Sequence, residues 1–209
     1  MLKLQDEGCH NINLVSPTHF TPGIVEAIRQ ACLKGLTLPI VYNTGGYDSI
    51  KNIRVLEGIV DIYLPDMRYS SDRMAKKYST APGYTANNRS IVREMHRQAG
   101  TLHISSDGIA TKGLLIRLLI LPGGISGTED SLEFIASKIG RDTYLSVMSQ
   151  YYPAYKAQRY KKLSHRIASK NYYSVIKKMR GLGLHKGWIQ PFAGDFGKEF
   201  AGENFKSSF

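Results

Sequence analysis

Short runs of apolar residues alternate along the chain with longer segments in which apolar residues recur every three or four positions. The short runs are rich in Ile, Leu and Val, and lie at residues 12–15, 38–42, 60–64, 114–121 and 144–148. Most of them do not alternate cleanly with polar residues, which is typical of strands buried on both faces of a parallel sheet. The order strand, helix, strand, helix therefore predicts an α/β fold built from βαβ units.

The intervening segments carry the start and stop signals of helices. Thr21 and Pro22 form an N-cap and first-turn pair, and Gly35 closes the helix that follows them. Similar patterns predict further helices over residues 49–56, over residues 128–140, and on either side of residues 82–83 within the range 71–100.

Two segments depart from this alternation. Residues 101–113 hold an Asp107-Gly108 turn between two short extended pieces, which predicts a hairpin insert. After residue 154 the chain becomes basic, helical and rich in tyrosine. We therefore predict a main α/β domain over residues 1–154 and a basic helical extension over residues 155–209.

Composition narrows the classes of function. No stretch of about 18 apolar residues is present, so the sequence predicts no membrane-spanning helix. The first residues lack a signal-peptide pattern, and the two cysteines, Cys9 and Cys32, have no partners at metal-ligand spacing. These features predict a cytoplasmic location without a disulfide framework. We expect Cys9 to lie in an unformed start of the chain and Cys32 on a helix.

The chain is strongly basic, with a formal net charge of +11. Such a charge favours anionic partners: nucleic acid, a nucleotide or an acidic protein. Much of the excess lies in the last quarter, at Lys156, Arg159, Lys161, Lys162, Arg166, Lys170, Lys177, Lys178, Arg180 and Lys186. A solvated helical face has the same pattern, so the charge alone does not select a partner.

Polar residues follow the apolar runs. In parallel α/β folds the carboxyl ends of the strands meet at one edge, where binding and catalysis are concentrated. These ends supply, in chain order, Ser16, Thr18 and His19; Asn43, Thr44, Gly45 and Gly46; Asp66 and Arg68; Arg117; and Ser149, Gln150 and Tyr152. We predict that they form a ring of polar groups around one pocket.

Each of these residues also has a structural interpretation. His19 is either a ligand or base, or a residue that caps the next helix or lies on the surface. The run 43–46 is either a polar turn whose glycines supply positive φ, or a cradle of backbone amides around a ligand.

Arg117 is the most informative single candidate residue, because it is a charged residue within the apolar run LLIRLLIL. A buried arginine is costly unless it is paired. It is therefore expected to meet a carboxylate, either that of Asp66 or one on a ligand. The sequence has no nucleophile triad, no GxGxxG loop and no P-loop, so it predicts no catalytic residue and no metal-ligand set.

Taken in order, the edge motifs resemble a known family. The runs HNINLVSPTHF, YNTGGYDS, DIYLPDMRYSSDRMAKKYS, DGIATKGLLIRLLILPGG and SVMSQYYPAY cover residues 8 to about 157. They resemble the radical S-adenosylmethionine enzymes, in the pyruvate formate-lyase activating enzyme group and its PflX-like branch. The resemblance implies a partial (β/α) barrel of the TIM-like kind.

The resemblance also implies cofactors and a partner. In that family a CxxxCxxC motif after the first strand holds a [4Fe–4S] cluster, which cleaves S-adenosylmethionine to a 5′-deoxyadenosyl radical. In the activating enzymes this radical takes a hydrogen from a glycine of a partner enzyme. The present chain has no CxxxCxxC. We therefore expect it to be the carboxyl-terminal portion of such an enzyme, without the first βα unit, without a cluster and inactive alone.

The resemblance assigns the edge residues to the S-adenosylmethionine site. Ser16, Thr18 and His19 stand where many members have a Gly-Gly-Glu turn that meets the cofactor's amino group. Arg117 matches an arginine that meets the cofactor's carboxylate, as the fork of its guanidinium favours. The strand ends that the resemblance places beside the cofactor are Asn43, Thr44, Asp66, Arg68, Gln150 and Tyr152.

A second hypothesis is a non-catalytic α/β domain that binds a nucleotide-like ligand, or RNA through the basic extension. Aromatic residues lie among its charges, at Tyr155, Tyr160, Tyr172 and Tyr173, where they could stack on bases. The pattern fits no named nucleic-acid module. On the first hypothesis the basic extension docks an acidic protein substrate. A sheet edge left open where the family's first strand would lie would allow a dimer.

Overall fold

The structure is a computed structural model, and it describes residues 1–192. The strands are β1 (Ile12–Val15), β2 (Ile40–Thr44), β3 (Ile62–Pro65), β4 (His103–Ile104), β5 (Ala110–Leu119), β6 (Tyr144–Met148) and β7 (Gly187–Ile189). The α-helices are α1 (Leu2–Asp6), α2 (Thr21–Leu33), α3 (Ile50–Val55), α4 (Asp72–Ser79), α5 (Tyr84–Ala99), α6 (Thr128–Lys138) and α7 (Ser169–Gly181). Short 3₁₀ turns are η1 (Pro17–Phe20), η2 (Pro122–Gly124) and η3 (Tyr155–Arg159).

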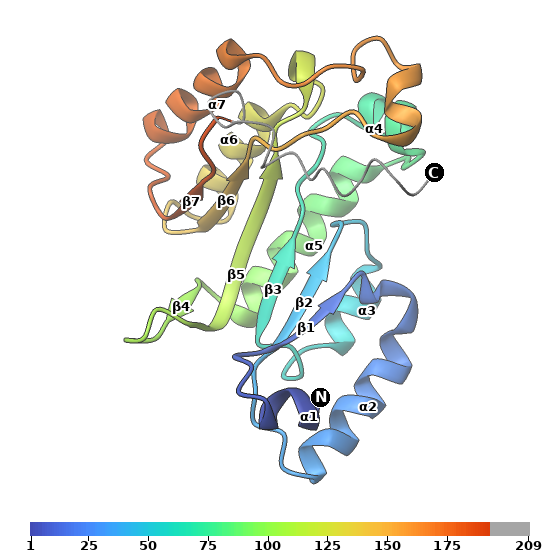
Figure 1. Cartoon of the computed structure of the whole chain (residues 1–209), viewed down its shortest axis with the longest axis vertical. Helices are drawn as coiled ribbons and strands as arrows, with labels where there is room; N and C mark the ends of the chain where they lie inside the picture. The colour runs from blue at the N-terminus through green and yellow to red at the C-terminus, as the bar shows by residue number, and fades with distance from the viewer. Residues whose placement is uncertain (193–209) are drawn as a thin grey trace.

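One sheet runs through the molecule in the order β1-β2-β3-β5-β6-β7 (Figure 1). Neighbouring strands along this path are parallel, and β4 joins β5 antiparallel as the predicted hairpin. The predicted α/β fold class is confirmed, and the arrangement is compatible with a partial (β/α) barrel. Because every strand on the path points the same way, all the carboxyl ends meet at one edge.

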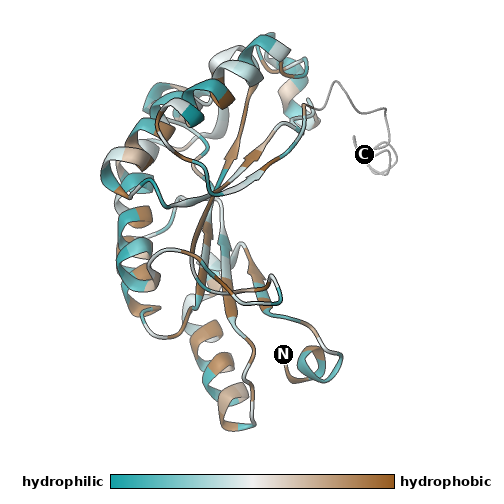
Figure 2. Ribbon diagram, turned by 90° about the vertical axis from the view of Figure 1, so that its left-hand side faces the viewer, coloured by the Kyte–Doolittle hydropathy of each residue, from teal (hydrophilic) through white to brown (hydrophobic). Residues whose placement is uncertain are grey.

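The two faces of the sheet differ. On one face, alternate strand residues such as Tyr42, Tyr63 and Ile116 pack against helices α2, α3, α5, α6 and α7 to form the main core. Figure 2 shows most helices stacked along this side of the sheet. The other face carries a small apolar cluster, centred on Val41, Ile62 and Leu102, and is otherwise open.

The helices begin and end close to the residues that the sequence predicted. One detail differs: Thr21 is the first residue of α2 and Phe20 is its N-cap. The Thr21 hydroxyl donates to the Thr18 carbonyl oxygen at 3.2 Å, so it stabilises the preceding 3₁₀ turn.

The expectation of an unformed start is wrong. Residues Leu2–Asp6 form α1, which the Gln5 side chain fastens to the segment after α2. The Gln5 amide donates to the Gly35 carbonyl at 3.0 Å, and its oxygen accepts from the Thr37 N–H at 2.7 Å. These long-range hydrogen bonds hold a helix that is too short to be stable in isolation. Cys32 does lie on a helix, α2.

The range predicted as a helical extension also contains a strand. Helix α7 lies in it as expected, but β7 follows and pairs with β6, with Trp188 opposite Ser146. A strand of three residues is too short to show a periodicity, so the sequence pattern missed it. The described part of this range therefore continues the sheet, and its remaining residues, 193–209, lie outside the described residues. Across residues 1–192, no helix combines the length and apolarity needed to cross a membrane.

Candidate functional site

Three of the predicted edge residues meet at the carboxyl ends of β3 and β5. Asp66 lies directly opposite Arg117 on the open face of the sheet, where the two form an isolated parallel bridge. The Nε of Arg117 donates to Asp66 Oδ1 at 2.7 Å, and the Nη2 of Arg68 donates to Asp66 Oδ2. The sequence predicted that Arg117 pairs with a carboxylate, and in the structure that carboxylate belongs to Asp66.

This trio, Asp66, Arg68 and Arg117, carries one carboxylate against two guanidinium groups. The Asp66 side chain is only 8% exposed, whereas that of Arg117 is 26% exposed and that of Arg68 is 43% exposed. Within residues 1–192 the two terminal nitrogens of Arg117 make no hydrogen bond, and the buried Nε of Arg68 has no partner. The trio therefore presents unused donors and an excess positive charge to an anionic group.

A second cluster ties the ends of β1 and β2 together around Asp48, a buried carboxylate that is 2% exposed. It accepts hydrogen bonds from the hydroxyls of Thr18 at 2.5 Å, Thr44 at 2.6 Å and Tyr42 at 3.0 Å. Within residues 1–192 no lysine or arginine forms an ion pair with it, and the hydrogen bonds to its carboxylate oxygens come from these three hydroxyls. Two predicted residues, Thr18 and Thr44, are therefore joined by one that the prediction left out.

Helix α5 supports both edge loops from the helix side of the sheet. The Asn88 amide donates to the carbonyl oxygens of Gly46 at 2.8 Å and Asp66 at 2.9 Å. One turn earlier, the Tyr84 hydroxyl accepts from the Arg68 N–H at 2.9 Å. Because Tyr84 and Asn88 are four positions apart on one helix, they lie on the same side of it and fix the two loops relative to each other.

Three buried tyrosines make the fold sensitive to high pH. Burial raises the pKa of Tyr42, Tyr63 and Tyr84 above the usual value of about 10, and nearby acidic groups add to the shift. Above pH 10 the unfolded chain loses these protons while the folded chain keeps them. Each such tyrosine then lowers the free energy of unfolding by about 1.4 kcal/mol per pH unit.

We expect the stability that these tyrosines contribute to be intact below pH 10 and to fall as the pH rises beyond it. Urea unfolding at pH 9, 10 and 11 measures this fall. In the Tyr84→Phe variant the free energy of unfolding should fall less steeply with pH, by about 1.4 kcal/mol per pH unit. An identical slope in the wild type and the variant would show that Tyr84 does not contribute.

The other predicted residues are more dispersed. Ser16 and His19 are exposed, and Ser16 adopts a left-handed φ of +52°. Asn43 lies on the open face, opposite Val15 and next to Leu64 in register. The cap of α2 is Phe20, so the structure does not support a capping role for His19.

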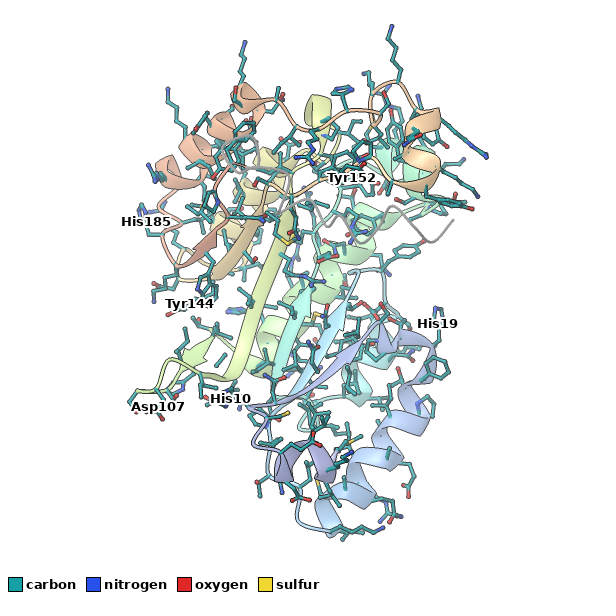
Figure 3. The ribbon with its side chains drawn as sticks, viewed as in Figure 1. His10, His19, Asp107, Tyr144, Tyr152 and His185 are labelled. Carbon is teal, nitrogen blue, oxygen red and sulfur yellow. The ribbon has the colours of Figure 1, made fainter. Side chains whose placement is uncertain are left out.

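Gln150 and Tyr152 lie at the far side of the edge. Gln150 accepts a hydrogen bond from Gln190 at 3.3 Å, and the Arg166 guanidinium lies over the Tyr152 ring at 5.6 Å. Figure 3 shows His19 and Tyr152 on opposite halves of the sheet. The predicted residues therefore form an edge that spans the sheet, with the trio near its middle, rather than one closed ring.

Three supporting residues were missed: Asp48, Tyr84 and Asn88. Asp48 stands in the motif YNTGGYDS, and an acid four positions after Thr44 at the close of a Gly-Gly turn is a signal that could have found it. Tyr84 and Asn88 act over 16 to 42 residues of sequence separation. Local pattern carries no information about such contacts.

Comparisons with known proteins support the fold. No family model matches the chain. An uncharacterised protein of Methanocaldococcus jannaschii, MJ0674, is 24% identical over 179 residues, which cover 85% of this chain and 47% of that protein. The chain thus spans about half the length of this curated relative. Among solved structures, a domain of pyruvate-formate lyase-activating enzyme from Bacteroides vulgatus matches with a TM-score of 0.57 and 13% identity. The match covers 87% of this chain and 99% of that domain.

At 13% identity the match to the solved domain concerns the fold alone. It supports the predicted α/β fold, with an arrangement similar to that of the solved activating-enzyme domain.

The residues of this chain do not fit a [4Fe–4S] cluster. The chain has two cysteines, whereas such a cluster takes about four donors. Cys9 precedes β1 and Cys32 lies exposed on α2. Within residues 1–192, no group of three or more His, Cys, Asp or Glu side chains is placed to hold a metal ion.

Proposed function

We propose that this chain forms the S-adenosylmethionine-binding portion of a radical S-adenosylmethionine-type enzyme. The observation that carries the proposal is the unused fork of Arg117, held by Asp66 at the carboxyl edge of the parallel sheet. The likeness of the fold to an activating-enzyme domain supports it.

The geometry of the trio suits an amino-acid carboxylate. Asp66 engages only the Nε of Arg117, which leaves the Nη1 and Nη2 donors for a second carboxylate. Charge-assisted hydrogen bonds from arginine to a carboxylate are roughly twice as strong as neutral ones. Asp66 holds the guanidinium in place and offsets part of its charge, so the fork is oriented before the ligand arrives.

For the whole protein we propose radical chemistry on a partner, as in the glycyl-radical activating enzymes. The ligands of a cluster would then come from sequence outside these 209 residues, since the two cysteines of this chain do not suffice. The residues described here would hold the cofactor's carboxylate and keep its orientation fixed.

Calorimetric titration of S-adenosylmethionine into the full chain tests the proposal. We expect saturable binding that Arg117→Ala weakens at least about tenfold, because a charge-assisted pair contributes about 1.5–3 kcal/mol. The matched control is Arg73→Ala, since Arg73 is an exposed arginine on α4 away from the trio. This control should keep the wild-type affinity.

Methylthioadenosine isolates the contribution of the carboxylate, because it keeps the nucleoside and lacks the amino-acid group. We expect it to bind the wild type and Arg117→Ala with equal affinity. If Arg117→Ala and Arg73→Ala bind S-adenosylmethionine alike, or if the wild type does not bind it, the proposal is wrong. Tighter binding of methylthioadenosine than of S-adenosylmethionine would favour a nucleotide-like ligand instead.

A further inference from the structure

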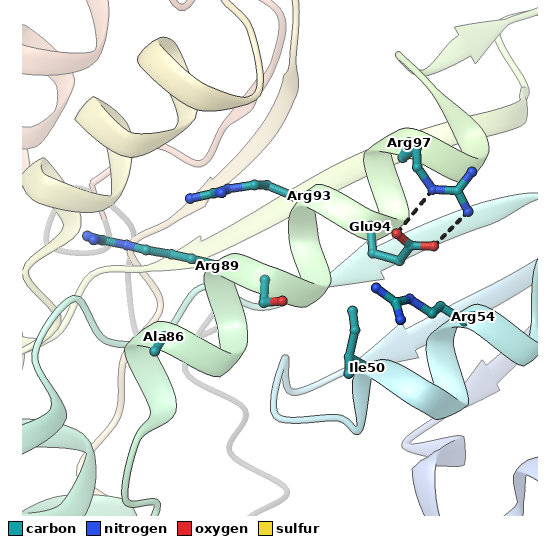
Figure 4. A pocket seen from close by; sticks show the side chains of 8 residues that line it. Ile50, Arg54, Ala86, Arg89, Arg93, Glu94 and Arg97 are labelled. Atoms are coloured by element: carbon teal, nitrogen blue, oxygen red, sulfur yellow. Dashed lines mark hydrogen bonds and ion pairs between the residues drawn. The ribbon is translucent and has the colours of Figure 1, made fainter.

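A groove rich in arginine runs between α3 and α5 on the helix side of the sheet. Its volume is about 500 Å³, and the charged residues that line it are Arg54, Arg89, Arg93, Glu94 and Arg97 (Figure 4). The lining therefore holds four arginines and one glutamate. The sequence analysis did not single out any of these residues, and the proposed cofactor site does not use them.

The glutamate is already neutralised within the groove. Arg97 Nε donates to Glu94 Oε2 at 3.1 Å and Arg97 Nη2 to Glu94 Oε1 at 2.7 Å. The hydrogen bond from Arg97 lowers the pKa of Glu94 to about 2, and one from Gln98 contributes further. Arg97 also pairs with Glu57 through two hydrogen bonds. The hydrogen-bonding groups of Arg97 are therefore occupied by Glu94 and Glu57.

The three remaining arginines have no such partner. In the described part of the chain, Arg54, Arg89 and Arg93 form no ion pair and no side-chain hydrogen bond. The guanidinium groups of Arg89 and Arg93 lie over the ring of Phe134 on α6, at 5.0 and 5.5 Å from its centre. Stacking on this ring keeps the two long side chains extended, which reduces the entropy that a ligand would have to overcome.

The groove has a shape as well as a charge. Between the arginines, Ala86 and Ser90 present small side chains on α5, and Ile50 contributes an apolar contact from α3. Arg89 and Arg93 are one turn apart, so their spacing of about 6 Å matches acidic side chains one turn apart on another helix. Small residues on the floor allow such a helix to approach closely.

We propose that this arginine groove binds an acidic amphipathic helix of a partner protein. Acidic residues of that helix would pair with Arg54, Arg89 and Arg93, while its apolar residues would contact Ile50 and Ala86. A nucleic acid fits less well, because Phe134, the ring beside the groove, is covered by the two arginines that stack on it and is not free to stack on a base.

The inference does not depend on the proposed cofactor site. The groove lies on the helix side of the sheet, whereas Arg117 faces the open side, and no residue is shared between them. A variant that loses one kind of binding should keep the other, so failure of either proposal can be recognised separately.

The test uses a fluorescein-labelled helical peptide of alanine, leucine and glutamate, with glutamates four positions apart on one face. Fluorescence anisotropy with the full chain at fixed salt measures its affinity. We expect the double variant Arg89→Glu/Arg93→Glu to bind it at least about tenfold more weakly, because like charges across an interface are strongly unfavourable. Arg54→Glu should also weaken binding, because it reverses the charge of an arginine that lines the groove.

The matched control is Lys170→Glu/Lys177→Glu, which makes the same change of net charge on exposed positions of α7. It should bind the peptide within about twofold of the wild type at the same salt concentration. An equal loss in this control would show non-specific attraction and overturn the proposal, as would absence of saturable binding by the wild type. Tighter binding of a single-stranded oligouridine that the groove variants abolish would assign the groove to nucleic acid instead.

Discussion

Replacing Gly46 with alanine is expected to lower the free energy of unfolding by about 3–5 kcal/mol, the sum of a strained φ and a steric overlap. Gly46 has a φ of +76°, and a Cβ there would lie 2.0 Å from the Asp66 carbonyl oxygen and 2.4 Å from the Asn88 amide nitrogen. One of these atoms is backbone and the other belongs to a side chain held by two hydrogen bonds, so neither can move cheaply.

The neighbouring glycine provides a matched control. Gly45 has no heavy atom within 4 Å of an added Cβ, and its φ is outside the left-handed region. Gly45→Ala should therefore leave stability within about 0.5 kcal/mol of the wild type. Urea unfolding of both variants measures the difference. Equal midpoints for the two would mean that the loop after β2 does not hold the close approach seen here.

Gly46 matters for function because its loop carries Asp48 of one cluster and packs against the backbone of Asp66, which belongs to the trio. Its carbonyl oxygen accepts from Asn88, and Asn88 also holds the carbonyl of Asp66. A displaced loop would therefore shift the residue that orients Arg117. We infer that the tight packing behind the edge is what allows a weakly covered, open face to keep its polar groups in position.

Much of the fold could be predicted from the sequence because each apolar run places its inward-facing residues in the core, although the other face of the sheet is largely open. Residues 12–15 and 144–148 form strands at the predicted positions. The sequence also predicted that Arg117 pairs with a carboxylate, since a charge within an apolar strand has few ways to be stabilised. The pairing with Asp66 followed once β3 and β5 became neighbours in the sheet.

The features that the sequence pattern did not predict depend on contacts between distant residues or on very short elements. β7 joins the sheet with only three residues, and its pairing with β6 is a distant contact that local sequence pattern does not encode. Tyr172, which the sequence suggested as a base-stacking residue, is 5% exposed and packs in the core, because it lies on the apolar face of α7. Periodicity assigned the helix but not which of its tyrosines would face inward.

Helix α5 shows how one element can serve both proposed sites. Tyr84 and Asn88 on its inner side fix the loops of the cofactor edge, whereas Arg89 and Arg93 contribute to the arginine groove. The residues at 88 and 89 point to different sides because successive positions on a helix are about 100° apart. Residues on two different sides of α5 therefore contribute to the two proposed sites.

Asp48→Ala is the second change with a large expected effect, a loss of about 3 kcal/mol in the free energy of unfolding. The substitution removes the shared acceptor of Thr18, Tyr42 and Thr44, and each buried hydroxyl that loses its partner costs about 1 kcal/mol or more. Thr18→Val is the matched control, because it deletes one of the three donors with little change of shape.

Thr18→Val should lower the free energy of unfolding by only about 1 kcal/mol. The loss for Asp48→Asn should lie between those for Thr18→Val and Asp48→Ala, because the oxygen of the asparagine amide still accepts hydrogen bonds. Urea unfolding gives the three values in one series. A loss for Asp48→Ala no greater than that for Thr18→Val would mean that the hydroxyls find other acceptors, and that Asp48 does not join the ends of β1 and β2. The expected ranking instead requires that the carboxylate itself fix the β1 turn, and with it the positions of Ser16 and His19, against the sheet.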